Sequence, residues 1–297
     1  MPTSSSLPPI YSILSLKEIL VSPILWNSHH LDIVGCHFQE KDVPTDNSQG
    51  DCDAKRQDTE RTSDEEFEYF QVERLARSPF VAEKHNTLVA LLTHNGSPFE
   101  ERQIYDDSGF HFARKIVHRP QYAVFSRREP SRQPIDSAPQ PLIAYIEYSN
   151  VEYYRRERLR PREHPGGGYN AVGYGLYRKH LALATPKDWT KDPYLVCTLL
   201  ALAQLQRNHV HLPPSRLLMT SDEDYDFIYL YEAQISHELL AMLDEPAAMG
   251  SARWPVIEWR KIAYRPYETF KQRLVDALLP PSNSVRSAIV EETNTQI

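Results

Sequence analysis

Three charged side chains in the C-terminal half of the sequence have types and spacings suited to metal-dependent hydrolysis of a phosphodiester bond. A nuclease of the PD-(D/E)xK type carries an acid on one strand of a hairpin and a Glu-x-Lys on the next, which bind magnesium and position water. Asp226 precedes a β-prone run that ends in a Glu-x-Gln triplet at Glu232, and Lys261 lies on a later β-prone run. Asp226, Glu232 and Lys261 are therefore the catalytic candidates, as metal ligands and charge stabiliser.

A glycine- and tyrosine-rich stretch at 166–175 is the candidate for ligand binding. Glycine clusters bring bare backbone N–H groups together on an anion. The glycine spacing imitates a P-loop, but Tyr174 and Gly175 replace the required Lys and Ser/Thr, and no GxGxxG is formed. The stretch is therefore interpreted as a flexible turn or packing loop, with Tyr169, Asn170 and Tyr174 as candidate lining residues of a ligand groove.

Basic charge concentrates between residues 114 and 162, where 11 Lys/Arg face 5 acids. Such a segment, interleaved with tyrosines, is typical of proteins that bind nucleic acid, in which basic side chains contact the phosphate backbone and aromatic rings stack on the bases. Arg155, Arg156 and Arg158 are the candidate contacts. Two alternatives are a solvated face, or a basic surface covered by the acidic segment at 40–68, which has 11 acids and 4 Lys/Arg.

Other chemistries lack a required residue. His237 and Glu238 begin the HExxH zinc motif, but Ala241 occupies the position of the second histidine. No GxSxG elbow is present, and the three cysteines have neither metal-ligand spacing nor a catalytic signature. Apart from the nuclease candidates Asp226, Glu232 and Lys261, the sequence therefore supports no metal site, and the cofactor stays unknown.

Bulk properties narrow the class of protein. The 297 residues are enough for one large domain or two small ones, with a mean hydropathy of −0.53. The net charge of −7 argues weakly against nonspecific binding of polyanions by the whole molecule. The N-terminus lacks a signal-peptide pattern and the cysteines suit a reducing compartment, so we expect a cytoplasmic or nuclear location, no membrane association and a protein partner.

The order of local signals predicts an α+β fold with a mixed or mostly antiparallel sheet, packed helices and a partly disordered N-terminal region. In the first half of the chain we expect helices at 67–75 and 81–93, followed by a three-strand meander at 110–117, 122–126 and 142–148. In the second half we expect a helix at 192–206 and a hairpin of 216–220 and 227–232. A helix after Ser236, a strand at 256–263 and a helix after Pro266 follow the hairpin. Residues 1–66 form the N-terminal region with a disordered acidic linker at about 40–66, residues 67–281 a single domain, and residues 282–297 a disordered tail.

The strings at 192–194, 199–204, 217–220, 229–233 and 264–270 resemble a group of filamentous-fungal proteins to which no activity is assigned. The resemblance covers the last third of the chain. It implies an intracellular fungal setting, with an association to secondary metabolism as one option, and it carries no catalytic residues over. The preferred hypothesis is an accessory or binding protein; a degenerate metal-dependent nuclease or other small-molecule enzyme, and a nucleic-acid-binding protein, are the alternatives.

Overall fold

The computed structural model describes residues 21–41, 62–94, 96–104, 109–128, 141–246 and 252–279. Most of the predicted acidic linker and all of the predicted tail at 282–297 lie outside these ranges. The same is true of Cys52.

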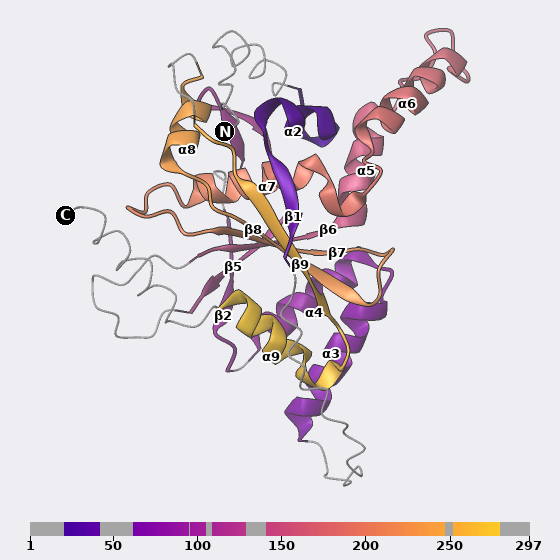
Figure 1. The fold of residues 1–297 in the computed structure, drawn as a ribbon. Helices are drawn as coiled ribbons and strands as arrows, with labels where there is room; N and C mark the ends of the chain where they lie inside the picture. Colours follow the sequence, from indigo (N-terminus) through magenta and orange to yellow (C-terminus); the bar gives the residue numbers. More distant parts are fainter. Residues whose placement is uncertain are drawn as a thin grey trace, which may run out of the picture.

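A seven-stranded mixed sheet forms the centre of the described structure (Figure 1). Its strands lie in the order β1-β9-β8-β7-β6-β5-β2. The pairs β1/β9 and β6/β7 are parallel and the other four pairs are antiparallel. The strands span β1 His37–Glu40, β2 Phe99–Arg102, β5 Ala123–Arg127, β6 Ile143–Glu147, β7 Ser215–Thr220, β8 Phe227–Ala233 and β9 Val256–Ala263. The predicted α+β class with a mixed sheet is confirmed.

Helices cover both faces of this sheet (Figure 1). One face packs against η1 (Pro23–Leu25), α2 (Ser28–Val34), η2 (Trp189–Lys191), α7 (Pro193–Leu205) and α8 (His237–Asp244). The other face packs against α3 (Ser63–Arg77), α4 (Val81–Thr93) and α9 (Tyr267–Leu278). Because strand side chains alternate in direction, strands β5 to β9 contribute to both cores, whereas β1 contributes only to the first and β2 only to the second.

Helix α7 begins where its local sequence predicts. The Asp192 carboxylate accepts a hydrogen bond from the Tyr194 backbone N–H at 2.9 Å, and Pro193 occupies the first helical position, where its missing N–H has no cost. Nearly every side chain of α7 is buried, including Cys197, and burial raises the pKa of its thiol. In the part of the chain that the structure describes, no helix is long and apolar enough to cross a membrane.

The segment at 21–40 belongs to the same core. Trp26 is buried and packs edge-on against Phe110, with ring centroids 5.8 Å apart. Strand β1 then pairs in parallel with β9, with Phe38 opposite Ile257. The apolar residues of this N-terminal segment therefore pack on the core formed by the rest of the described chain.

The predicted three-strand meander is wrong in its first strand. Ala113 and Arg114 have φ values of 50° and 60°, and this left-handed two-residue turn divides the predicted strand into β3 (Phe110–Phe112) and β4 (Lys115–His118). The two form a separate antiparallel hairpin, and β2 takes the place beside β5. Alternation has the same period on both sides of the turn, so the pattern does not reveal the break.

The predicted loop at 166–175 is also partly wrong. Helix α6 (Ala171–Ala184) starts inside it, and Asn170 caps the helix by accepting a hydrogen bond from the Gly173 N–H at 2.8 Å. A Cβ at Gly173 would lie only 2.6 Å from the Asn170 side chain, so the glycine serves the cap. With α5 (Tyr148–Leu159), α6 forms an arm that projects from the body of the molecule (Figure 1).

Candidate functional site

The three predicted catalytic residues do not meet. Asp226 is exposed at the start of β8, and Glu232 is paired with Arg216, whose Nε lies 3.0 Å from Oε1. The β8/β9 register places Lys261 opposite Tyr229, so Lys261 and Glu232 point to opposite faces of the sheet. The Lys261 ammonium instead lies over the rings of Phe227, Tyr229 and Trp259, at 5.5 to 6.0 Å from their centroids.

The candidate nucleic-acid arginines have different environments. Arg155 is buried and forms an ion pair with Asp192, with Nη2 and Oδ2 2.7 Å apart, so it is not a surface contact. The spacing of arginines along a helix does not reveal this, because only the packing of α5 on the body turns one of them inward. Arg156 is exposed and pairs with Glu152 at 3.0 Å, and Arg158 is exposed.

The candidate groove residues lie on the projecting arm. The rings of Tyr169 and Tyr174 stack with centroids 4.9 Å apart, and Asn170 is the cap of α6. They do not line the cavity of about 570 Å³ that lies on the body of the molecule.

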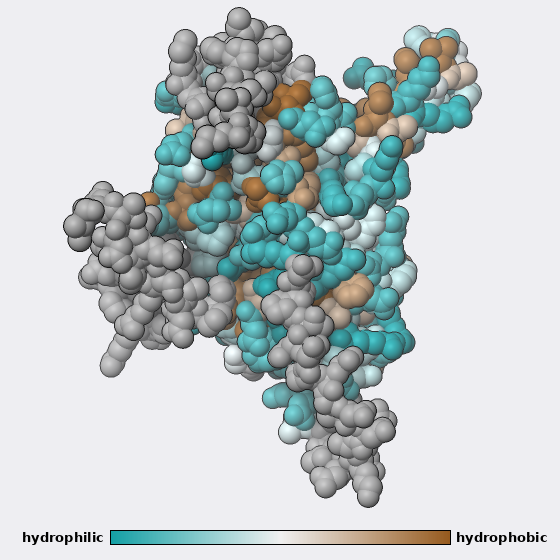
Figure 2. All heavy atoms as spheres, in the orientation of Figure 1, coloured by the Kyte–Doolittle hydropathy of each residue, from teal (hydrophilic) through white to brown (hydrophobic). Residues whose placement is uncertain are grey.

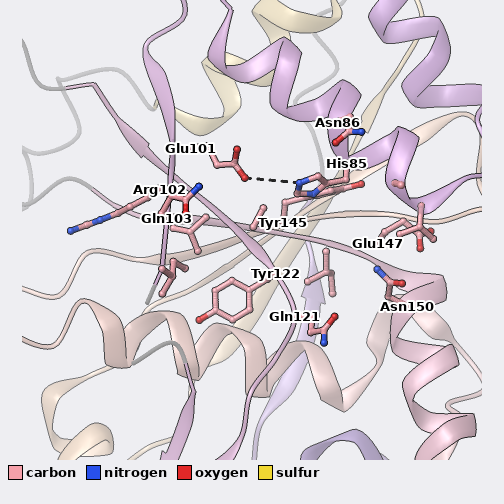
Figure 3. Close-up of a pocket in the computed structure, with 16 residues that line it drawn as sticks. His85, Asn86, Glu101, Arg102, Gln103, Gln121, Tyr122, Tyr145, Glu147 and Asn150 are labelled. Carbon is pink, nitrogen blue, oxygen red and sulfur yellow. Dashed lines mark ion pairs between the residues drawn. The ribbon is translucent and has the colours of Figure 1, made fainter. Parts of the chain in front are cut away.

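That cavity, here called the hairpin cleft, lies between α4 and the β5–β6 hairpin (Figure 3). Its volume of about 570 Å³ is within the range of small-molecule sites. The polar side chains that line it come from α4, β2, the segment before β5, the end of β6 and the start of α5: His85, Asn86, Glu101, Arg102, Gln103, Gln121, Glu147 and Asn150.

The register of the hairpin explains why these groups meet. Ala123 pairs with Tyr145 in the antiparallel register, and Gln121 and Glu147, which lie just beyond this pair on the two chain segments, both line the cavity. Glu147 is the last residue of β6, and Ser149 follows in the first turn of α5. An acid on one strand and Glu-x-Lys on the next is the nuclease arrangement described above. Only its glutamate is present at this hairpin, because Gln121 stands before β5 instead of a first acid and Ser149 lies in α5 instead of a lysine.

Glu147 is buried, with 3% of its surface exposed. Its Oε2 accepts a hydrogen bond from the Ser149 hydroxyl, whereas its buried Oε1 has no hydrogen-bond partner among the described residues. Loss of hydration raises the pKa of this carboxyl group, because burial disfavours the charged form.

Lys84 lies on α4 and is fully buried. Its ammonium donates a hydrogen bond to the Ser221 carbonyl at 2.8 Å. Burial lowers the pKa of Lys84, and the negative charge of Glu147 opposes this shift. The site thus holds a buried acid and a buried base that stabilise each other's charged form.

The rim of the cleft carries a second titratable group. The His85 ring stacks on Tyr145 with centroids 6.1 Å apart, and its Nε2 lies 4.0 Å from Glu101 Oε1 (Figure 3). The Tyr154 hydroxyl, which lies outside the cleft, donates to Gln121 Oε1 at 2.5 Å and fixes the orientation of that amide. The cleft therefore has a buried hydrogen-bond acceptor, the Glu147 carboxyl group, and the His85 imidazole and side-chain amides line the same cavity.

The sequence analysis missed this site, although one signal is present in the sequence. Glu147 closes the apolar run 142–146, and an acid at the end of a buried strand is unusual unless it has a partner or a role. Gln121 has no such signal, because only the pairing of β5 with β6 brings it to the cleft.

The donor set of the cleft does not fit a two-acid magnesium site. One carboxylate of the hairpin pair is replaced by an amide, and over the described ranges no three His, Cys, Asp or Glu side chains form a group that could hold a metal ion. The arrangement by itself therefore indicates hydrogen bonding rather than metal coordination. In comparisons with protein-family models, curated proteins and solved structures, no match to this chain was found.

Proposed function

We propose that this chain is a binding protein that admits a small polar ligand to the hairpin cleft and holds it through the Glu147 carboxyl group. The observation that carries the proposal is the buried, unpaired Oε1 of a residue that lines the cleft. A buried polar atom without a partner costs about 1–3 kcal/mol. A ligand with an ammonium, amide N–H or hydroxyl donor removes this cost, so the proposed ligand class is a small hydrogen-bond donor.

The surrounding groups support selection of such a ligand. The Gln121 and Asn150 amides and the His85 imidazole line the same cavity and supply further hydrogen bonds. An accessory role in an intracellular fungal setting, as the resemblance of the last third implies, is part of the same proposal.

Native mass spectrometry of the freshly purified full-length chain tests this function. We expect a small-molecule mass increment over the denatured chain, and we expect Glu147→Gln or His85→Ala to lower its occupancy at least tenfold, roughly the effect of losing one charge-assisted hydrogen bond. The matched control is Glu100→Gln, an exposed carboxylate on β2 outside the cleft.

If the ligand is lost during purification, the protein can be titrated with a panel of small amines, amides and alcohols. Binding is then detected as changes in the backbone amide chemical shifts of the protein. Shifts at Gln121, Glu147 and Asn150 that disappear in Glu147→Gln support the proposal. Bare wild-type protein together with an absence of shifts at the cleft across the panel would overturn it.

A degenerate metal-dependent nuclease is the second candidate function. Its sequence candidates Asp226, Glu232 and Lys261 lie apart, and at the β5–β6 hairpin only the Glu147 carboxylate of the nuclease arrangement is present. Because the first acid and the lysine are replaced, we expect no cleavage of plasmid DNA in Mg²⁺ or Mn²⁺.

Incubation of the wild-type chain with supercoiled plasmid and either ion, compared with Glu147→Ala and Glu232→Ala, measures this directly. Cleavage that is lost in Glu147→Ala alone would establish the nuclease and replace the binding proposal. Cleavage that all variants share would reveal a contaminating nuclease and leave the expected result intact.

A further inference from the structure

A second cavity, here called the aliphatic pocket, adjoins the hairpin cleft. Its volume is about 190 Å³, and it shares four lining residues with the cleft, which are Arg102, Gln103, Ile104 and Val124. Glu147 and Gln103 lie at opposite ends of the cleft in the view of Figure 3. The aliphatic pocket therefore adjoins the cleft at the end away from the buried carboxyl group.

The lining of this pocket differs from that of the cleft. Four of its six lining side chains are aliphatic, and they belong to Ile104, Val124, Leu142 and Leu205. These four are buried or half-buried, whereas the two polar residues of the lining are exposed. Apolar side chains are also visible on the surface of the projecting arm (Figure 2), but the side chains of the pocket enclose a volume. A cavity with an apolar lining accepts apolar groups more readily than water.

The ends of neighbouring elements create the pocket. Strand β2 ends at Arg102, which pairs with Val124, so the chain leaves the sheet beside β5 at this point. On another side, the Leu142 N–H donates to Gln206 Oε1 at 2.8 Å, and this bond joins the residue before β6 to the residue after α7. Because Leu142 and Leu205 lie on these joined segments, the pocket is formed before any ligand enters it.

The sheet register gives the distance between the pocket and the carboxyl group. Val124 pairs with Ala144, and Glu147 lies three residues further along β6. Three residues of a strand span about 10 Å. A ligand that donates a hydrogen bond to Glu147 therefore needs an extended chain of that length to reach the pocket.

We propose that the ligand of the hairpin cleft is a linear amphiphile, whose hydrogen-bond donor binds Glu147 and whose unbranched alkyl chain occupies the aliphatic pocket. This inference rests on the proposed function and adds the apolar part of the ligand. Aliphatic side chains offer no hydrogen bond to a buried polar group, so the pocket favours a hydrocarbon chain over a second polar end. Each methylene group that enters it from water should strengthen binding about fourfold.

Titration of the full-length chain with the series of n-alkylamines from methylamine to n-decylamine tests the inference, with dissociation constants taken from backbone amide chemical shifts. We expect Kd to fall about fourfold for each methylene group that enters the pocket, and to level off once the pocket is filled. Glu147→Gln should weaken every member of the series by a similar factor, because it changes only the partner of the amine.

Leu205 lines the aliphatic pocket but not the cleft, so its variants test the pocket separately. Leu205→Phe fills the pocket, and we expect it to weaken the tightest amine at least tenfold, which is the effect of about two methylene groups, while methylamine is unaffected. Leu205→Ala enlarges the pocket and should move the levelling-off to a longer chain. The matched control is Leu183→Phe, in a 67% exposed position on α6, which should leave the series unchanged.

Circular dichroism checks that each variant is folded, and the opposite expected effects of Leu205→Phe and Leu205→Ala separate filling of the pocket from misfolding. Glu147-dependent binding with a Kd that does not change with chain length would overturn this inference and leave the proposed function standing. A gain with chain length that Leu205→Phe does not reduce would do the same.

Two other results concern the amine itself. A gain with chain length that Glu147→Gln does not weaken would overturn both the inference and the proposed function. An absence of shifts at the cleft with every amine would overturn the inference, and the amides and alcohols of the wider panel would then decide the proposed function separately.

Discussion

Replacing Asp192 with asparagine should lower the free energy of unfolding by about 3–5 kcal/mol, because Arg155 would lie buried without an opposite charge. Arg155 and Asp192 are 1% and 0% exposed, and their ion pair measures 2.7 Å. Asparagine is itself a good N-cap for α7, so this substitution isolates the loss of charge from the loss of the cap.

Two further contacts make this pair a junction of separate elements. The Tyr148 hydroxyl donates to Asp192 Oδ2 at 2.8 Å, and Arg155 Nε donates to the Ile24 carbonyl at 3.0 Å. The pair thus connects the arm, the N-terminal segment and the start of α7. Since a domain is stable by only about 5–15 kcal/mol, its disruption removes a large share of the total.

Urea denaturation followed by tryptophan fluorescence measures this effect. The control is Asp188→Asn, which breaks a half-exposed pair with Lys191 and should cost no more than about 1 kcal/mol. Replacing both charges, as in Arg155→Met with Asp192→Asn, should restore much of the loss, because no charge remains buried and the cap of α7 is kept. A loss below about 1 kcal/mol in Asp192→Asn would contradict the expected role of the pair.

This pair also changes how nucleic-acid binding should be tested. A variant with Arg155, Arg156 and Arg158 all replaced would lose binding simply because it unfolds. Replacing only the two exposed arginines, Arg156 and Arg158, keeps the buried pair intact and reports on the surface alone.

Replacing Lys84 with methionine should destabilise the protein by about 2–3 kcal/mol at pH 8, because the Ser221 carbonyl loses its buried donor and Glu147 loses a nearby cation. The chain offers a matched control in the exposed Lys187, whose replacement by methionine should change stability by no more than about 0.5 kcal/mol.

The loss should depend on pH in a defined direction. The pKa of Glu147 is already raised in the folded protein, and removal of Lys84 raises it further. Between its ordinary pKa of 4.5 and the raised value, the folded state binds more protons than the unfolded state, so stability falls as pH increases. The Lys84→Met protein should therefore be closer to wild type at pH 5 than at pH 8.

Denaturation curves of Lys84→Met and of Lys84→Met with Glu147→Gln at both pH values measure this coupling. The double variant should be more stable than the single variant at pH 8, because a neutral amide has no charge to desolvate. Equal stability of the two at pH 8 would show that Lys84 does not stabilise the Glu147 carboxylate.

Local signals were sufficient to predict several elements of this fold. The Asp192-Pro193 start of α7, the strand Val256–Ala263 and the helix Val81–Thr93 are where the sequence places them. Caps, prolines and hydrophobic period act over a few residues, so they can be recognised without knowledge of the rest of the chain. The same local character explains why the turn at Ala113 and Arg114 was missed, since neither residue type indicates a left-handed conformation.

The sites were decided by contacts between residues far apart in the chain. Glu147 and Gln121 line one cleft because β5 pairs with β6, and Arg155 becomes a buried partner of Asp192 because α5 packs beside the start of α7. Conversely, the apolar sequence of α6 predicts burial, yet its position on the arm leaves Leu176 exposed. The sequence by itself determined where most elements begin and what fold class they form. Only the tertiary structure decided which side chains share a cleft, an ion pair or a surface, because register and packing are set by the whole chain.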